Sequence, residues 1–69
     1  MNRIAIVRER AGITQVDLYT KLKWRQSRLS NYEGEKRPLK LTDAREIVSA
    51  LNELGAETSF DEVFPVDTD

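Results

Sequence analysis

The chain has 69 residues, of which 11 are basic and 12 acidic, and it contains neither histidine nor cysteine. The commonest metal ligands, general bases and thiol nucleophiles are therefore missing, and the carboxylates form no paired arrangement, so we expect no enzyme, no metal and no other cofactor. No apolar run approaches the roughly 20 residues of a membrane-spanning helix and no signal-like start is present, which favours one small domain in the cytoplasm.

Charge is distributed unevenly along the chain. Residues 1–45 contain all 11 basic residues against five acidic ones, a net charge of +6, whereas residues 46–69 contain seven acidic residues and no basic one, a net charge of −7. A local positive potential attracts a polyanion even when the whole protein is slightly acidic, because exposed charges farther apart than about 8 Å are screened at physiological salt. The acidic end is either a solvated tail or a segment that binds a protein partner.

A first helix is expected after Asn2, which can cap its N-terminus, and should run to about residue 11. Ile4 and Val7 lie at helical spacing, and Gly12 provides a C-terminal stop. Ile13 should then pack at the junction with the next element.

Two short helices are expected next. The apolar residues of this segment recur at spacings of 4, 2, 5 and 3, which a single helix cannot place on one face: Leu18, Leu22, Trp24, Leu29 and Tyr32. Thr14 fits the N-cap of a helix over residues 15–22, with Asp17 as an imperfect partner in a capping box. The following helix should begin near Arg25 and cross the first near Lys23.

The second of these helices has a polar outer face rich in hydrogen-bonding groups: Gln26, Ser27, Arg28, Ser30 and Asn31. Gln can bind adenine through two hydrogen bonds, Arg can bind guanine and Ser can bind either base, so this face suits base edges in the major groove of DNA. A surface helix without a ligand would more often carry Glu and Lys. The pattern predicts a helix-turn-helix that docks on DNA rather than an ordinary helical hairpin, with Tyr32 in the core and its hydroxyl near the surface.

The remaining elements supply the scaffold. A basic loop over residues 34–41 leads to Thr42, the predicted N-cap of a helix over residues 43–54. Its buried stripe is predicted to be Ala44, Ile47, Val48, Leu51 and Leu54. A last short helix is expected from Ser59, where Glu62 completes a capping box.

The end of the chain carries more apolar surface than five short helices readily bury. We expect Phe60 and Val63 to close the core. Phe64 and Val66, which flank Pro65, are predicted to contact a second copy of the chain, because exposed apolar patches on small proteins often mark such interfaces.

Five segments occur in the order found in the phage repressor and Cro-like helix-turn-helix proteins, also called the XRE family: ITQVDL, RQSRLSNYE, EKRP, DAREIVSALN and FDEVF. The chain resembles this family over nearly its whole length. The resemblance implies an all-α, five-helix, lambda-repressor-like DNA-binding domain, in which RQSRLSNYE is the recognition helix and EKRP lies in the following loop.

The resemblance also implies roles for individual residues. It places Trp24 in the core, at the family's buried apolar position after the turn, with a stacking platform as the alternative. Gln15 would bind a phosphate and brace the recognition helix, and Arg8 would pair with Glu33, with two independently solvated side chains as the alternative. Base contacts would come from the recognition helix, through Gln26, Ser27, Arg28 and Asn31. Further phosphate contacts would come from the start of that helix and the basic loop, through Arg25, Lys36 and Arg37.

Three positions depart from the family pattern. Lys23 stands where Gly is usual, Tyr19 where a small residue is usual, and Arg25 where Ser or Thr caps the recognition helix. A left-handed backbone costs a residue with a Cβ roughly 1 kcal/mol or more, so Lys23 implies a modified turn. Tyr19 is too large for a close helix approach, so the helices should splay slightly or the ring should reach solvent.

These features predict a sequence-specific transcriptional regulator, a Cro-like repressor that binds a palindromic double-stranded DNA operator as a homodimer. The alternative is an antitoxin-type protein-interaction module, in which the acidic segment over residues 57–69 binds a partner protein. The predicted organisation is one DNA-binding domain over residues 1–64 and a short acidic tail over residues 65–69. No membrane partner is expected.

Overall fold

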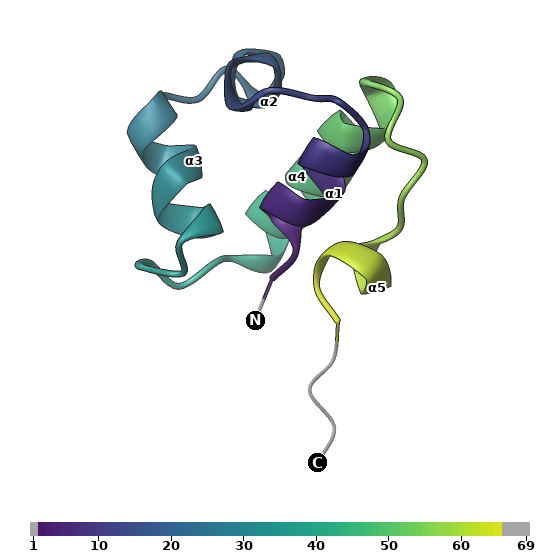
Figure 1. Cartoon of the computed structure of the whole chain (residues 1–69). Coiled ribbons are helices and arrows are strands. Elements are labelled where there is room, and N and C mark those ends of the chain that lie inside the picture. Colours follow the sequence, from purple (N-terminus) through teal and green to yellow (C-terminus); the bar gives the residue numbers. More distant parts are fainter. Residues whose placement is uncertain (1, 66–69) are drawn as a thin grey trace.

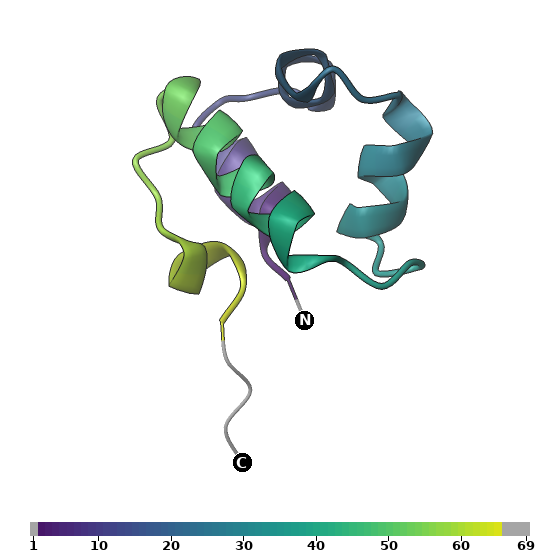
Figure 2. The ribbon, with the colours of Figure 1, turned by 180° about the vertical axis from the view of Figure 1, so that it is seen from behind.

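The computed structural model describes residues 2–65, which form five helices and, within that range, no strand (Figure 1). The helices are α1 (Ile4–Arg10), α2 (Gln15–Leu22), α3 (Gln26–Glu33), α4 (Leu41–Glu53) and α5 (Phe60–Val63). α4 packs against α2 and α5, and α3 packs against α2. Seen from behind, α4 lies in front of α1, with α2 and α3 to one side and α5 to the other (Figure 2). The expected all-α, five-helix architecture is confirmed.

Arg3 occupies the N-cap position of α1, one residue after the predicted Asn2, and the Asn2 side chain binds both the first turn of the helix and α3. Its Oδ1 accepts the backbone N–H of Ile4 at 3.2 Å, and its Nδ2 donates to the carbonyl oxygen of Tyr32 at 2.8 Å. α1 ends at Arg10, and Gly12 adopts a left-handed φ of 73° in the turn that follows. The predicted start and stop of this helix are therefore confirmed to within a residue.

The capping box at the start of α2 is complete. The backbone N–H of Asp17 donates to Oγ1 of Thr14, and the backbone N–H of Thr14 donates to Oδ2 of Asp17, both at 3.0 Å. The backbone hydrogen bond, followed by the hydroxyl hydrogen bond, holds the pKa of the Asp17 carboxyl below its ordinary value. Asp, with its shorter side chain, thus fulfils the role usually given to Glu or Gln in this motif.

The turn between α2 and α3 contains no glycine. Lys23 adopts left-handed angles, φ 61° and ψ 36°, and the backbone N–H of Trp24 donates to the carbonyl oxygen of Tyr19 at 2.9 Å. The expectation of a modified turn is therefore wrong: α2 ends in the usual left-handed conformation, which lysine adopts here at a cost that glycine would not have.

α4 begins two residues earlier than predicted. Its N-cap position is occupied by Lys40, whose carbonyl oxygen accepts the N–H of Ala44 at 2.9 Å, and the prediction that Thr42 caps this helix is wrong. The cause is Asp43, which sits within the first turn and turns its carboxylate inward to bind α3. Long-range side-chain bonds thus set where this helix lies, and no side chain caps it.

The core combines buried apolar residues of all five helices and of the turn before α2: Ile4, Val7, Ile13, Leu18, Leu29, Tyr32, Ile47, Ala50, Leu51 and Val63. Val48 and Leu54, predicted as fully part of the α4 stripe, are only half-buried at its edge. Tyr19 is half-buried at the same edge, as expected for a ring that partly reaches solvent. None of the helices in residues 2–65 is long and apolar enough to span a membrane.

The single turn of α5 closes the core with a different residue pair from the one predicted. Val63 is fully buried and Phe64 packs against the core edge, whereas Phe60 is half-exposed and lies outside the core cluster. The expectation that Phe60 closes the core is therefore wrong. With so few residues, only the C-terminal end of α5 reaches inward, and the ring of Phe60 contacts that of Phe64 from outside, with ring centroids 5.2 Å apart.

The predicted capping box of α5 would have two hydrogen bonds, and one of them is present, from the N–H of Glu62 to the Ser59 hydroxyl. Oγ of Ser59 accepts the N–H of Glu62 at 3.3 Å, and the Ser59 hydroxyl donates to the Glu62 carboxylate at 3.5 Å. The predicted dimer residue Val66 and all but the first residue of the predicted tail lie outside the described residues.

Candidate nucleic-acid interface

α3 presents a polar face to solvent because its apolar residues all point the other way. Leu29 is fully buried and Tyr32 is 5% exposed. Gln26 and Ser27 are exposed at the start of the helix, and Asn31, one turn further along on the same side, is half-exposed. These three predicted base contacts therefore share one accessible face.

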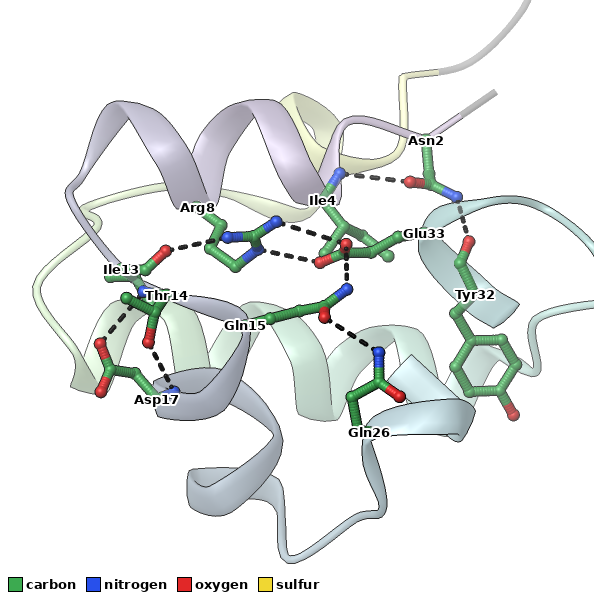
Figure 3. Close-up of polar contacts among 10 residues, drawn as sticks. All are labelled: Asn2, Ile4, Arg8, Ile13, Thr14, Gln15, Asp17, Gln26, Tyr32 and Glu33. Atoms are coloured by element: carbon green, nitrogen blue, oxygen red, sulfur yellow. Dashed lines mark hydrogen bonds and ion pairs between the residues drawn. The ribbon is translucent and has the colours of Figure 1, made fainter. Parts of the chain in front are cut away.

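A chain of hydrogen bonds connects the start of α3 to its end through the first residue of α2 (Figure 3). Nε2 of Gln26 donates to Oε1 of Gln15 at 3.3 Å, and Nε2 of Gln15 donates to Oε1 of Glu33 at 3.0 Å. Gln15 therefore braces the recognition helix at both ends, which is the intramolecular part of the role implied for it. Its amide carries two N–H donors, so one remains beyond the bond to Glu33.

The chain ends in an ion pair that the protein largely covers. Nε and Nη2 of Arg8 donate to the two carboxylate oxygens of Glu33 at 2.9 and 3.4 Å, and Nη1 donates to the carbonyl oxygen of Ile13 at 3.1 Å. The Arg8 and Glu33 side chains are only 12% and 10% exposed. The forked geometry fixes α3 against α1 and the turn before α2, and the predicted pair is confirmed.

The side chain of Arg28, the fourth predicted base contact, binds Asp43 and Trp24 of its own chain. Its Nη2 donates to Oδ1 of Asp43 at 3.0 Å, and its guanidinium lies 4.1 Å from the centroid of the Trp24 ring, a cation–π arrangement. The second carboxylate oxygen of Asp43 accepts the hydroxyl of Tyr32 at 2.8 Å. Arg28 thus ties α3 to α4, and a contact with a base would require its free donors or release from Asp43.

Asp43 was missed as a functional residue because nothing near it in the sequence indicates its partners. The hydrogen bond from Tyr32 lowers the pKa of its carboxyl, burial opposes this, and the bond from Arg28 lowers it further. Burial likewise acts to lower the pKa of Arg28, but hydrogen bonds with Tyr32 and Asp43 outweigh burial and raise it. Both groups are therefore charged at neutral pH.

One aromatic prediction is confirmed in part and the other needs correction. Trp24 is half-buried and packs against the core cluster, with the Arg28 guanidinium over its ring and the Tyr32 ring at a centroid distance of 5.5 Å. Tyr32 is in the core as predicted, but its hydroxyl lies in a buried hydrogen bond to Asp43 and not near the surface. Both rings help to hold α3 in place.

The predicted phosphate contacts Arg25, Lys36 and Arg37 are exposed. The loop that carries the last two turns back on α3, because the N–H of Lys36 donates to the carbonyl oxygen of Asn31 at 2.9 Å and Glu35 adopts a left-handed φ of 56°. An open hollow of about 400 Å³ follows this flank of α3, and we call it the α3 hollow. Its lining residues are Lys23, Trp24, Arg25, Ser27, Arg28, Asn31 and Arg37.

In a comparison with protein families, residues 4–56 match a family described as Helix-turn-helix. This range covers more than half of the chain and includes α1 to α4. No curated protein and no solved structure matches significantly.

Proposed function

The chain belongs to the helix-turn-helix family of Cro- and XRE-type DNA-binding transcriptional regulators, and we propose that it is a Cro-like repressor that binds a palindromic operator as a homodimer. The observation that carries this proposal is the bond between Gln15 and Gln26. It couples the start of α2, where family members contact a phosphate, to the first residue of the recognition helix.

Bases would be contacted from the exposed start of α3. Gln26 can form two hydrogen bonds with adenine, and Ser27 and Asn31 can donate to or accept from base edges. Arg28 has donors that Asp43 does not use, so it would reach guanine only at the margin of this face. We therefore assign direct base contact first to Gln26 and Ser27, then to Asn31.

Phosphates would be bound on both flanks of α3. The second amide hydrogen of Gln15 suits a phosphate oxygen at the start of α2, where the helix dipole also favours an anion. Arg25, Lys36 and Arg37 are exposed cations that suit the other contacts.

A homodimer would place two recognition helices in successive major grooves, about 34 Å apart, over an inverted repeat. We keep Phe64 and Val66 as the dimer contact, although Phe64 also packs against the core of its own chain. Binding to the bacterial chromosome would place the protein in the cytoplasm. Sedimentation with and without operator DNA tests the dimer, and a 1:1 complex on an inverted repeat would refute it.

The function is tested by two substitutions, one expected to change sequence preference and the other to weaken binding to every DNA sequence equally. Gln26→Ala should cost about 1–3 kcal/mol at one base position and relax the sequence preference there. Arg37→Ala should weaken binding to all duplexes alike. If Gln26→Ala reduced affinity equally for operator and random DNA, direct base contact by α3 would be refuted.

A further inference from the structure

The α3 hollow concentrates positive charge beside the face that would contact bases. Four of its seven lining residues are cationic, namely Lys23, Arg25, Arg28 and Arg37, and none is acidic. Arg28 is balanced by Asp43 beneath it. The other three cations are exposed and form no ion pair with another residue in the range 2–65 that the structure describes.

Lys23 is the unexpected member of this group. It was not expected to touch DNA, and it occupies the left-handed position of the turn, φ 61°, which destabilises a residue with a Cβ. Two backbone hydrogen bonds close the helix end here, from Lys23 to Thr20 and from Trp24 to Tyr19, but they do not involve the lysine side chain. Among residues 2–65, that side chain forms neither a hydrogen bond nor an ion pair with another residue. Unfavourable backbone conformations of this kind concentrate at functional sites.

One wall of the hollow is held by contacts within the protein. The Arg28 guanidinium lies 4.1 Å from the centroid of the Trp24 ring and donates to the Asp43 carboxylate at 3.0 Å, and both contacts oppose its movement into the space beside α3. Ser27 and Asn31 border the hollow on the side of the base-contacting face. A DNA strand whose bases faced Ser27 would therefore pass its backbone along this flank.

We propose that the α3 hollow receives the sugar–phosphate backbone of one DNA strand, with Lys23 and Arg25 binding phosphate before α3 and Arg37 after it. The inference rests on the proposed function, because it names where on the DNA-binding surface one strand lies. It adds Lys23 as a phosphate contact and makes Trp24 and Arg28 one wall of the hollow, with Asp43 holding Arg28 from outside it.

Salt titration tests this site, because log affinity falls linearly with log salt and each protein–phosphate contact makes that fall steeper by about 0.9. Below, the slope means the magnitude of this fall. The probe is a fluorescent duplex of random sequence, about 20 base pairs long, titrated between about 50 and 200 mM salt. The variants are Lys23→Ala, Lys23→Arg and Lys23→Gly. Lys21→Ala is the matched control, since Lys21 lies two residues away but pairs with Glu53 at 3.7 Å on the side of α4.

We expect Lys23→Ala and Lys23→Gly to lower the slope by about one, and Lys23→Arg and Lys21→Ala to leave it unchanged. Lys23→Gly should at the same time resist denaturant better than the wild type. A reduced slope in this variant would then reflect the lost phosphate contact and not unfolding of the protein. Arg37→Ala combined with Lys23→Ala should lower the slope by about two.

Equal slopes for Lys23→Ala and Lys21→Ala would overturn the inference while leaving the proposed function intact, provided the wild type binds the duplex. Failure of the wild type to bind any duplex at low salt would instead refute the proposed function itself.

Discussion

Nε2 of Gln26 lies 3.3 Å from Oε1 of Gln15, and through this bond the first residue of the recognition helix is oriented by the first residue of the preceding helix. The same Gln15 amide donates to Glu33, which Arg8 binds in turn. A predicted base contact is therefore fixed by three residues behind it. This pre-orientation lowers the entropy lost when the side chain binds a base.

Removing the brace should impair recognition without unfolding the protein. We expect Gln15→Ala to weaken operator binding by about 1–3 kcal/mol and to reduce discrimination at the base that Gln26 contacts. Fluorescence anisotropy on the operator and on duplexes altered at that base measures both effects. Thr20→Ala, an exposed change on the same helix, is the control. Unchanged discrimination in Gln15→Ala would show that Gln26 needs no support.

The ion pair between Arg8 and Glu33 should matter for stability because it is nearly covered. Arg8→Met leaves the Glu33 carboxylate without its forked partner, and we expect a loss of about 3 kcal/mol in the free energy of unfolding. Lys21→Ala breaks an exposed pair and should cost at most about 1 kcal/mol. Urea denaturation of both variants gives the comparison. Equal losses would contradict a structural role for the covered pair.

Acid should weaken the link between α3 and α4. The pKa of Asp43 is below its ordinary value of 3.8, mainly through the Tyr32 hydrogen bond, so the unfolded chain takes up a proton before the folded chain does. The contribution of this group is fully present above that value and is lost as pH falls through the lower pKa of the folded state. The difference in unfolding free energy between wild type and Asp43→Asn should therefore shrink below pH 3.8. Denaturant titrations over this range check the sign, and a difference that grows on acidification would contradict it.

The turn between α2 and α3 offers a substitution that should stabilise the fold. Lys23→Gly relieves the left-handed conformation at φ 61° and should raise the free energy of unfolding by about 1 kcal/mol. Lys23→Ala retains the Cβ and should give no such gain. Thermal or urea denaturation distinguishes the two, and a destabilised glycine variant would mean that the lysine side chain supports the turn.

Local sequence signals predicted most of this fold. The capping box of Thr14 and Asp17 depends only on residues three apart, and the limits of α2 follow from it. The same holds for Ser59, whose hydroxyl caps α5. The exposed face of α3 was likewise predictable, because burial of Leu29 and Tyr32 determines which side faces solvent.

The errors have a common cause in contacts between distant residues. From the sequence alone, Asp43 is expected to be a surface residue in the first turn after Thr42. In the structure it lies opposite Arg28 and Tyr32, so its carboxylate points inward, and α4 begins earlier than predicted. The order of Phe60 and Phe64 at the core depends on how one turn of helix meets the rest of the bundle. Periodicity within a segment contains no information about either arrangement.

Specific recognition of an operator is the central claim, and selection of random duplex DNA by the purified protein at about 150 mM salt tests it most directly, since weak nonspecific phosphate binding is then suppressed. The account predicts enrichment of an inverted repeat whose half-sites lie about one helical turn apart. Absence of any enriched sequence would contradict it and favour a partner-dependent role, such as the antitoxin-type alternative, for the acidic end of the chain.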